Sequence, residues 1–117
     1  MDRMDRTERI AALYRAFNDR DLEAVLDAMT PDVDWPNGWE GGRLEGRAAV
    51  RRYWERQWAQ VRPMTTVKAV AELPDGSVEA SVHLVVRDPA GLVLDRSTVT
   101  HVYEFAGPLV RRMTQRP

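Results

Sequence analysis

Residues 13–35 read LYRAFNDRDLEAVLDAMTPDVDW, and this stretch decides the fold because it predicts two short helices followed by an extended exit. The first helix is predicted to start after Asp5, since Asp5 and Glu8 have the spacing of a capping box. Apolar side chains then recur with helical spacing at Ile10, Leu13, Tyr14 and Phe17. Asp21 is predicted to cap a second helix that ends before Pro31. Its buried stripe is Leu22, Val25, Leu26 and Met29.

A third helix is predicted from Arg47 to about Val61, and after it the sequence changes to an alternating period. Stretches rich in Val and Thr, separated by the turn sequences PDG, DPAG and AGP, predict four strands. The predicted strands are 64–73, 77–87, 92–106 and 109–113. Short turns favour antiparallel neighbours, so we expect a four-stranded meander after three helices, an α+β arrangement without a parallel sheet.

The segment 34–46, DWPNGWEGGRLEG, joins the second and third helices and is unusually rich in tryptophan and glycine. Pro36 favours extended geometry at Trp35, so residues 33–35 are predicted to form a short strand. Alternation along a strand sends Asp34 and Trp35 to opposite sides. Two interpretations of Trp35 and Trp39 stay open: their indoles form the wall of a pocket, or they plug the open end of the core.

The composition fits a single domain spanning residues 1–117, without a charge excess that would attract nucleic acid or an anionic membrane. Seventeen basic side chains oppose eighteen acidic ones, and there is no cysteine. The N-terminal stretch MDRMDRTER is too charged for the apolar core of a signal peptide, which favours a cytoplasmic protein. We therefore expect neither a nucleic-acid nor a membrane partner.

Three stretches carry a resemblance that covers almost the entire chain: residues 13–35, LEGRAAVRRYW at 44–54 and THVYEFAGPLVRRM at 100–113. They resemble the superfamily of nuclear transport factor 2, SnoaL-like polyketide cyclases, ketosteroid isomerases and limonene-epoxide hydrolases. The resemblance implies a cone-shaped α+β barrel, with three N-terminal helices packed on the concave face of a bent, mostly antiparallel sheet. It also implies a pocket inside the cone and a homodimer formed through the convex face. It fixes no single activity, because this fold hosts many reactions.

The catalytic patterns of two relatives are absent from this chain. Steroid isomerases of the superfamily carry a carboxylate directly before the proline of the corresponding segment, where this chain has Trp35 before Pro36. The place of their first-helix tyrosine falls on Leu13 rather than Tyr14. The Asp-Arg-Asp trio of limonene-epoxide hydrolases is not recognisable in this sequence either. The sequence therefore predicts neither steroid isomerisation nor epoxide hydrolysis by the residues that those relatives use.

His101 is the strongest candidate for chemistry, because alternation puts it on the mainly apolar face of its predicted strand together with Tyr103. Similarity to SnoaL-like members, which often show histidine before V-F or V-Y, implies a place in the pocket. A neutral imidazole there is suited to general acid or base work, with Asp34 as its orienting or proton-accepting partner. The alternative is a core histidine that is hydrogen-bonded to Asp34 or to a backbone carbonyl.

The remaining predicted ligand-binding residues are mostly aromatic: Tyr14, Phe17, Trp35, Trp39, Trp54, Trp58, His83 and Tyr103. Parity places His83 on the polar, convex side of its strand, so it is a secondary candidate. The glycines match no nucleotide-binding loop, and two distant histidines predict no metal site and no cofactor.

Two classes of function therefore remain. One is a cofactor-independent isomerase, cyclase or hydrolase that acts on a small apolar carbonyl, enol or epoxide compound. The other is a ligand-binding or dimeric assembly module that keeps the pocket without turnover.

Overall fold

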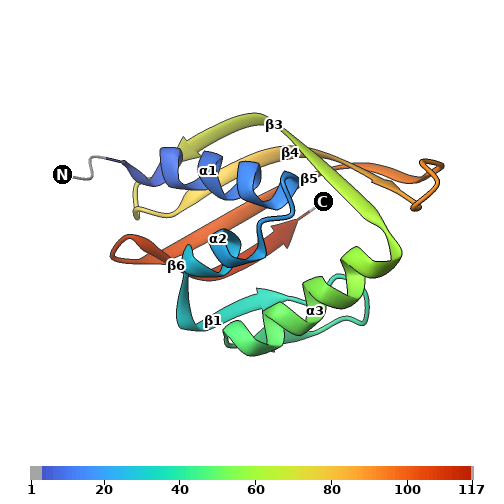
Figure 1. Ribbon diagram of the computed structural model, residues 1–117. Coiled ribbons are helices and arrows are strands. Elements are labelled where there is room, and N and C mark those ends of the chain that lie inside the picture. Colours follow the sequence, from blue (N-terminus) through green and yellow to red (C-terminus); the bar gives the residue numbers. More distant parts are fainter. Residues whose placement is uncertain (1–3, 117) are drawn as a thin grey trace.

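The computed structural model describes residues 4–116, in which three helices pack against one side of a six-stranded sheet (Figure 1). The helices are α1 (Arg6–Asn18), α2 (Leu22–Asp27) and α3 (Arg47–Gln60). The strands are β1 (Met29–Pro36), β2 (Arg43–Glu45), β3 (Arg62–Glu72), β4 (Val78–Arg87), β5 (Val93–Ala106) and β6 (Leu109–Arg116). The predicted α+β class with a mostly antiparallel sheet is confirmed. Residues 1–3 and 117 of the predicted domain lie outside the described residues.

The helix starts follow the predicted caps. The Asp5 side chain accepts from the backbone N–H of Glu8, and the Glu8 side chain returns a bond to Asp5, which completes the capping box of α1. Asp21 accepts from the backbone N–H of Ala24 and caps α2. α2 ends earlier than predicted, at Asp27, so Met29 belongs to β1 and not to the helical stripe.

The sheet is larger than the predicted four-stranded meander. Its strand order is β2-β1-β6-β5-β4-β3. The meander accounts for β3 to β6, and the predicted short strand at 33–35 is the centre of the longer β1. The expectation of no parallel pairing is wrong at one place, because β1 runs parallel to β6 while β2 pairs antiparallel with β1.

The core lies between the helices and the face of the sheet that they cover. Residues at alternate positions of β4 and β5 point toward it, among them Val78, Ala80, Val82, Val99 and Tyr103. Asn18 at the end of α1 fastens this helix to the edge strand β3, because its amide donates to the Thr65 carbonyl and accepts from the Thr65 N–H, at 2.9 Å each. None of the helices within residues 4–116 is both long and apolar enough to cross a membrane.

Candidate functional site

A cavity of about 410 Å³ lies between α1, α3 and the covered face of the sheet. Its lining is mostly apolar and aromatic: Leu13, Tyr14, Phe17, Val25, Trp35, Pro36, Gly38, Trp39, Tyr53, Trp54, Gln57, Val61, Pro63, Thr65, Leu84, Val86, Asp95, Ser97, His101, Tyr103, Met113 and Gln115. The volume is in the range of pockets that enclose small organic molecules. A few polar groups among many apolar ones are the usual means of orienting such a ligand.

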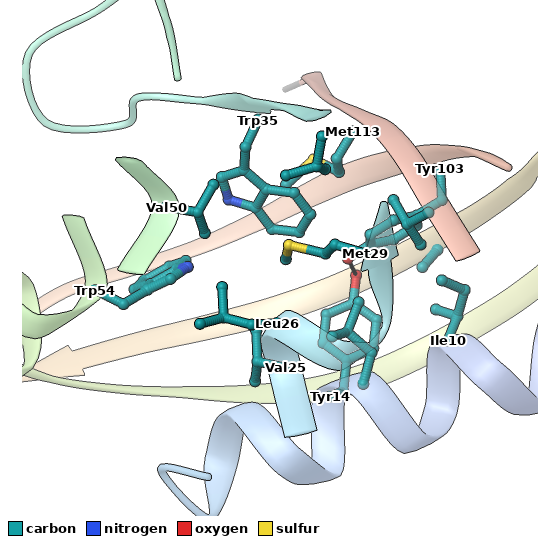
Figure 2. Close-up of a cluster of buried hydrophobic side chains, with 14 of the residues drawn as sticks. Ile10, Tyr14, Val25, Leu26, Met29, Trp35, Val50, Trp54, Tyr103 and Met113 are labelled. Atoms are coloured by element: carbon teal, nitrogen blue, oxygen red, sulfur yellow. Dashed lines mark hydrogen bonds between the residues drawn. The ribbon is translucent and has the colours of Figure 1, made fainter. Parts of the chain in front are cut away.

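His101 is held by hydrogen bonds to both of its ring nitrogens. Nδ1 lies 2.7 Å from the hydroxyl of Tyr14, and Nε2 lies 3.1 Å from Oε1 of Gln115. The hydroxyl of Tyr103 donates to the oxygen of Tyr14 at 2.8 Å, a contact visible in Figure 2. These four side chains form one chain of hydrogen bonds that runs from Tyr103 to Gln115. We call them the Tyr–His network.

The direction of the hydrogen bonds in the network follows from their acceptors. Because Oε1 of Gln115 is an acceptor, Nε2 of His101 carries the proton and donates it. Nδ1 is then the acceptor, and Tyr14 donates to it. Tyr14 in turn accepts from Tyr103. Both phenol protons are therefore already engaged, and only oxygen lone pairs remain to meet a ligand.

Burial keeps the network neutral near neutral pH. Desolvation lowers the pKa of His101, although the hydrogen bond to Gln115 works in the opposite direction. Desolvation raises the pKa of Tyr14, and it raises the pKa of Tyr103 as well, where Tyr14 adds to the effect. The imidazole is consequently uncharged and the two phenols stay protonated.

The opposite wall of the cavity comes from α3 and the segment before it. Tyr53, Trp54 and Gln57 are buried on one face of α3, and the Gln57 amide donates to the Tyr53 hydroxyl at 3.2 Å. Trp39 packs against Tyr53 with 6.4 Å between ring centroids, and it remains 45% exposed. Trp39 thus borders the opening of the cavity, whereas Trp35, 6% exposed, lies in its interior wall.

Electrostatically, the lining has only one charged side chain among the described residues, Asp95 on β5. Asp95 is exposed, which places its carboxylate at the rim. In the described part of the chain, no lysine or arginine lines the cavity. Within residues 4–116 there is also no cluster of three or more His, Cys, Asp or Glu side chains suited to a metal ion.

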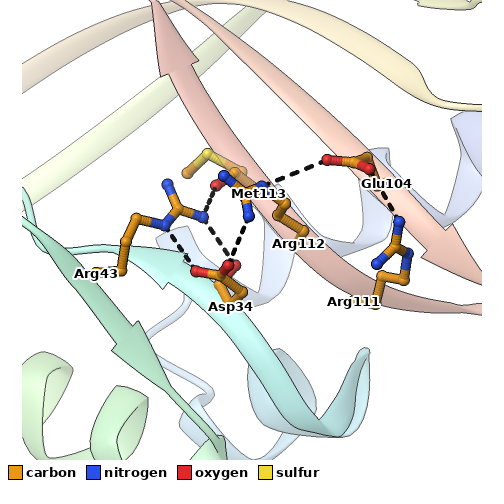
Figure 3. Close-up of polar contacts among 6 residues, drawn as sticks. All are labelled: Asp34, Arg43, Glu104, Arg111, Arg112 and Met113. Atoms are coloured by element: carbon orange, nitrogen blue, oxygen red, sulfur yellow. Dashed lines mark hydrogen bonds and ion pairs between the residues drawn. The ribbon is translucent and has the colours of Figure 1, made fainter.

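The expected pairing of Asp34 with His101 is wrong. β1 turns Trp35 toward the cavity, so alternation turns Asp34 to the other side of the sheet. There its carboxylate accepts from Arg43 at 2.6 Å and from Arg112 at 2.8 Å (Figure 3). Asp34 is therefore the centre of a surface ion-pair cluster that ties β1 to β2 and β6. Instead of Asp34, the hydrogen-bond partners of His101 are Tyr14 and Gln115.

Most of the other candidate residues line the cavity, but two do not. The structure brings Tyr14, Phe17, Trp35, Trp39, Trp54, His101 and Tyr103 together in the lining. Trp58 stands behind it, stacked on Trp54 with 5.6 Å between ring centroids. His83 projects from the uncovered face of β4, where Nδ1 lies 3.4 Å from the Thr98 hydroxyl. A place for Trp58 or His83 in direct contact with a ligand in this cavity is not supported.

Sequence reasoning missed several polar lining residues, and for some of them a signal was present. Asp95 and Ser97 share the parity of His101 along β5, so extending the alternation toward the N-terminal end of the strand identifies them. Gln57 follows Tyr53 by one helical turn. Gln115 was missed because the last strand was predicted to end at residue 113, whereas β6 continues and pairs Gln115 with His101.

Comparison with known proteins places the chain in a family. The profile of the SnoaL-like domain family matches residues 10–113. A search of curated proteins finds no match.

Solved structures share the fold over nearly the full chain. TerC, co-crystallised with polyporic acid, is 25% identical, with a TM-score of 0.79 over 92% of this chain and 87% of that chain. A cystatin-fold protein from Novosphingobium aromaticivorans is 21% identical, with a TM-score of 0.85 over 97% and 99% of the two chains. A Mycobacterium tuberculosis protein in complex with estradiol-17β-hemisuccinate is 18% identical, with a TM-score of 0.80 over 92% and 88%.

Proposed function

Because this chain belongs to the SnoaL-like domain family, we propose that it binds a small, mostly apolar organic molecule in the cavity and moves a proton on it without a cofactor. The observation that carries this proposal is the Tyr14 hydroxyl, which is fixed between Tyr103 and His101 in an otherwise apolar wall. A polar group that is oriented by a second and a third group is the arrangement that acid–base catalysis requires. The complexes of TerC and of the mycobacterial protein support a ligand in this fold.

In the proposed reaction, Tyr14 is the group that touches the ligand and His101 acts through it. A carbonyl compound places its acidic C–H against the Tyr14 oxygen, and the enol form of such a compound places its O–H there. The proton moves to this oxygen while the Tyr14 proton moves to Nδ1 of His101. The products are an enolate and an imidazolium whose Nε2–H still donates to Gln115. Return of the proton to a different carbon of the enolate completes an isomerisation.

Binding without turnover is the second candidate, and a specific observation favours it. Burial lowers the pKa of His101, which disfavours the imidazolium that proton transfer must form. In addition, the Asp34 carboxylate is paired with Arg43 and Arg112 on the other side of the sheet, so it does not stabilise that cation. On this alternative the Tyr–His network only orients the ligand.

Deuterium exchange separates the two candidates. We expect 2-tetralone, an uncharged ketone with acidic C–H groups, to bind and quench tryptophan fluorescence, because Trp35, Trp39 and Trp54 line the cavity. If the relay operates, the protein accelerates exchange of those C–H groups in D₂O. Tyr14→Phe and His101→Gln then lower the accelerated rate by roughly 10²–10⁴-fold. His83→Gln, on the other side of the sheet, is the matched control and leaves the rate unchanged.

The outcomes of this experiment are distinct. Binding of 2-tetralone without accelerated exchange contradicts the proposed proton transfer. Binding without turnover then remains as the function. If neither 2-tetralone nor larger ketones and phenols bind the wild-type protein, the proposed function as a whole is wrong.

We also propose a homodimer through the convex face of the sheet, which the helices leave uncovered (Figure 1). Leu94 and Met64 project from this side and are 53% and 41% exposed. Large apolar side chains that stay exposed on a broad sheet face are typical of a surface that a partner buries.

A further inference from the structure

Trp54 presents a buried hydrogen-bond donor without an acceptor. Its side chain is 9% exposed, and its Nε1 has no hydrogen-bond partner among residues 4–116. The ring is packed edge-on by Phe17 and Tyr53, each with 4.8 Å between centroids, and stacked on Trp58. The indole nitrogen itself is shielded from solvent. A buried N–H that lacks an acceptor is unfavourable, so such a group in a native protein calls for an explanation.

The unpaired Trp54 nitrogen is explained by its position at the cavity, where a ligand would supply the acceptor. Trp54 lines the cavity, and Figure 2 shows its nitrogen turned toward the side on which Trp35 lies. Trp58 also has an unpaired buried Nε1, but this residue does not line the cavity. Of these two indole donors, the one on Trp54 is therefore placed where a bound molecule would satisfy it.

The phenols of the Tyr–His network offer hydrogen-bond acceptors, whereas Trp54 offers a donor. The Tyr103 proton is given to Tyr14, the Tyr14 proton to His101, and the His101 proton to Gln115. What faces the cavity from these phenols is oxygen lone pairs, which accept hydrogen bonds. Trp54 on α3 thus offers a donor, and the oxygens of Tyr14 on α1 and Tyr103 on β5 offer acceptors.

The charged side chains around the cavity also restrict the charge that a ligand can carry. A buried anion needs a cation or several donors to replace its hydration. Among residues 4–116 no arginine or lysine lines the cavity, and the exposed carboxylate of Asp95 at the rim repels an approaching anion. An uncharged ligand avoids both penalties.

We infer that the cavity selects an uncharged hydroxy-carbonyl compound, whose carbonyl oxygen accepts from Trp54 Nε1–H and whose hydroxyl donates to the Tyr14 oxygen. This inference rests on the proposed function, since it names the ligand class of the same cavity. Trp54 is then the residue that determines specificity for the carbonyl group. Neither proton transfer nor turnover is required for this selection.

A set of probes of matched shape tests the inference: 6-hydroxy-1-tetralone, 1-tetralone, 5,6,7,8-tetrahydro-2-naphthol, tetralin and 6-hydroxy-2-naphthoate. They carry both groups, the carbonyl alone, the hydroxyl alone, neither group, and a hydroxyl with a carboxylate. We expect the first to bind wild-type protein most tightly in calorimetric titrations, and the carboxylate to bind at least about tenfold more weakly. A single hydrogen bond between neutral groups corresponds to roughly a 2–10-fold change in affinity.

Trp54→Phe removes the N–H and keeps an aromatic ring. We expect it to weaken both carbonyl probes by roughly 2–10-fold and to change the other uncharged probes by less than about twofold. Trp58→Phe is the matched control, because it removes an unpaired buried N–H that does not line the cavity. It should leave the carbonyl preference intact.

Nuclear magnetic resonance of the wild-type protein keeps the test independent of the variants' folding. We expect the indole Nε1–H resonance of Trp54 to move downfield on addition of 1-tetralone and not on addition of tetralin. Probes that bind without a carbonyl preference, with no such shift, overturn the inference but leave the binding function in place. Failure of every probe to bind the wild-type protein removes the proposed function itself.

Discussion

At the scale of single residues, the burial of His101 changes what this side chain does. An exposed histidine exchanges protons with water, whereas His101 is 8% exposed and both of its nitrogens are bonded. His101 therefore exchanges protons with its surroundings through its hydrogen bond to Tyr14. In the proposed function, the residue that contacts the ligand is Tyr14 on α1, 87 positions earlier in the chain.

The buried imidazole makes stability depend on pH. In the unfolded chain His101 binds a proton near its ordinary pKa of 6.5, whereas burial lowers this pKa in the folded chain. Below pH 6.5 the unfolded state therefore holds more protons, so the free energy of unfolding falls as pH decreases, by at most about 1.4 kcal/mol per pH unit from this group. Above that pH the contribution is constant. Urea unfolding between pH 5 and 8 measures it.

Two variants isolate the effect of His101. His101→Gln does not titrate, so the wild type should lose more stability than this variant as pH falls below 6.5. His83→Gln, which removes a histidine on the other face of the sheet, is the matched control for the loss of an imidazole. Equal slopes in wild type and His101→Gln would show that the imidazole is not held neutral by the fold.

At the scale of elements, the start of α3 depends on a backbone conformation that glycine alone adopts readily. Gly46 has φ of 86° and ψ of 156°, and its N–H donates to the Val33 carbonyl at 2.7 Å. This bond joins the start of α3 to β1, and α3 carries Trp54 and Gln57 into the cavity wall. A β-carbon at Gly46 would meet the Pro31 oxygen at 3.5 Å, which is ordinary contact. The difficulty for other residues is therefore the torsion angle.

Gly46→Ala should lower the free energy of unfolding by about 1–3 kcal/mol, because alanine is strained in this region. Gly46→Asn should not rescue stability: asparagine tolerates the left-handed helical region near ψ of about +47°, not an extended ψ. Chemical denaturation of both variants measures the loss. A stable asparagine variant beside an unstable alanine variant would contradict the conformation given for residue 46.

At the scale of the whole molecule, the sheet has one covered and one uncovered face. Helices shield the face that holds the cavity, and the uncovered face carries Leu94, Met64, Val85 and Val102 among threonines and charged side chains. Burying apolar area of this kind between two copies is the usual way in which a sheet loses an exposed apolar surface.

We predict that Leu94→Glu shifts the protein from dimer to monomer in sedimentation equilibrium at micromolar concentration. A carboxylate in an apolar interface loses its hydration without a partner, which weakens association. Leu92→Glu is the matched control, because Leu92 is 66% exposed in the turn before β5 rather than on the sheet face. A wild-type monomer at this concentration, or equal effects of the two variants, would exclude the convex-face dimer.

Local patterns in the sequence determined the class of fold and many of the residues that face inward. Capping at Asp5 and Asp21, the helical repeat of α1 and the alternation around His101 depend on neighbours within a few positions, so they are readable without a structure. The same alternation states that Asp34 and Trp35 face opposite ways. It does not state which of the two faces the core.

The tertiary structure decided everything that depends on contacts between distant segments. The parallel pairing of β1 with β6 turned Trp35 inward and placed Asp34 beside Arg112, 78 positions away, so Asp34 left the site. The register of β5 with β6 brought Gln115 to His101, and the packing of α1 brought Tyr14. Such contacts depend on how helices and strands dock, and residue spacing along a single element carries no information about docking. For this reason the sequence identified His101 correctly as an inward-facing histidine and assigned it the wrong partner.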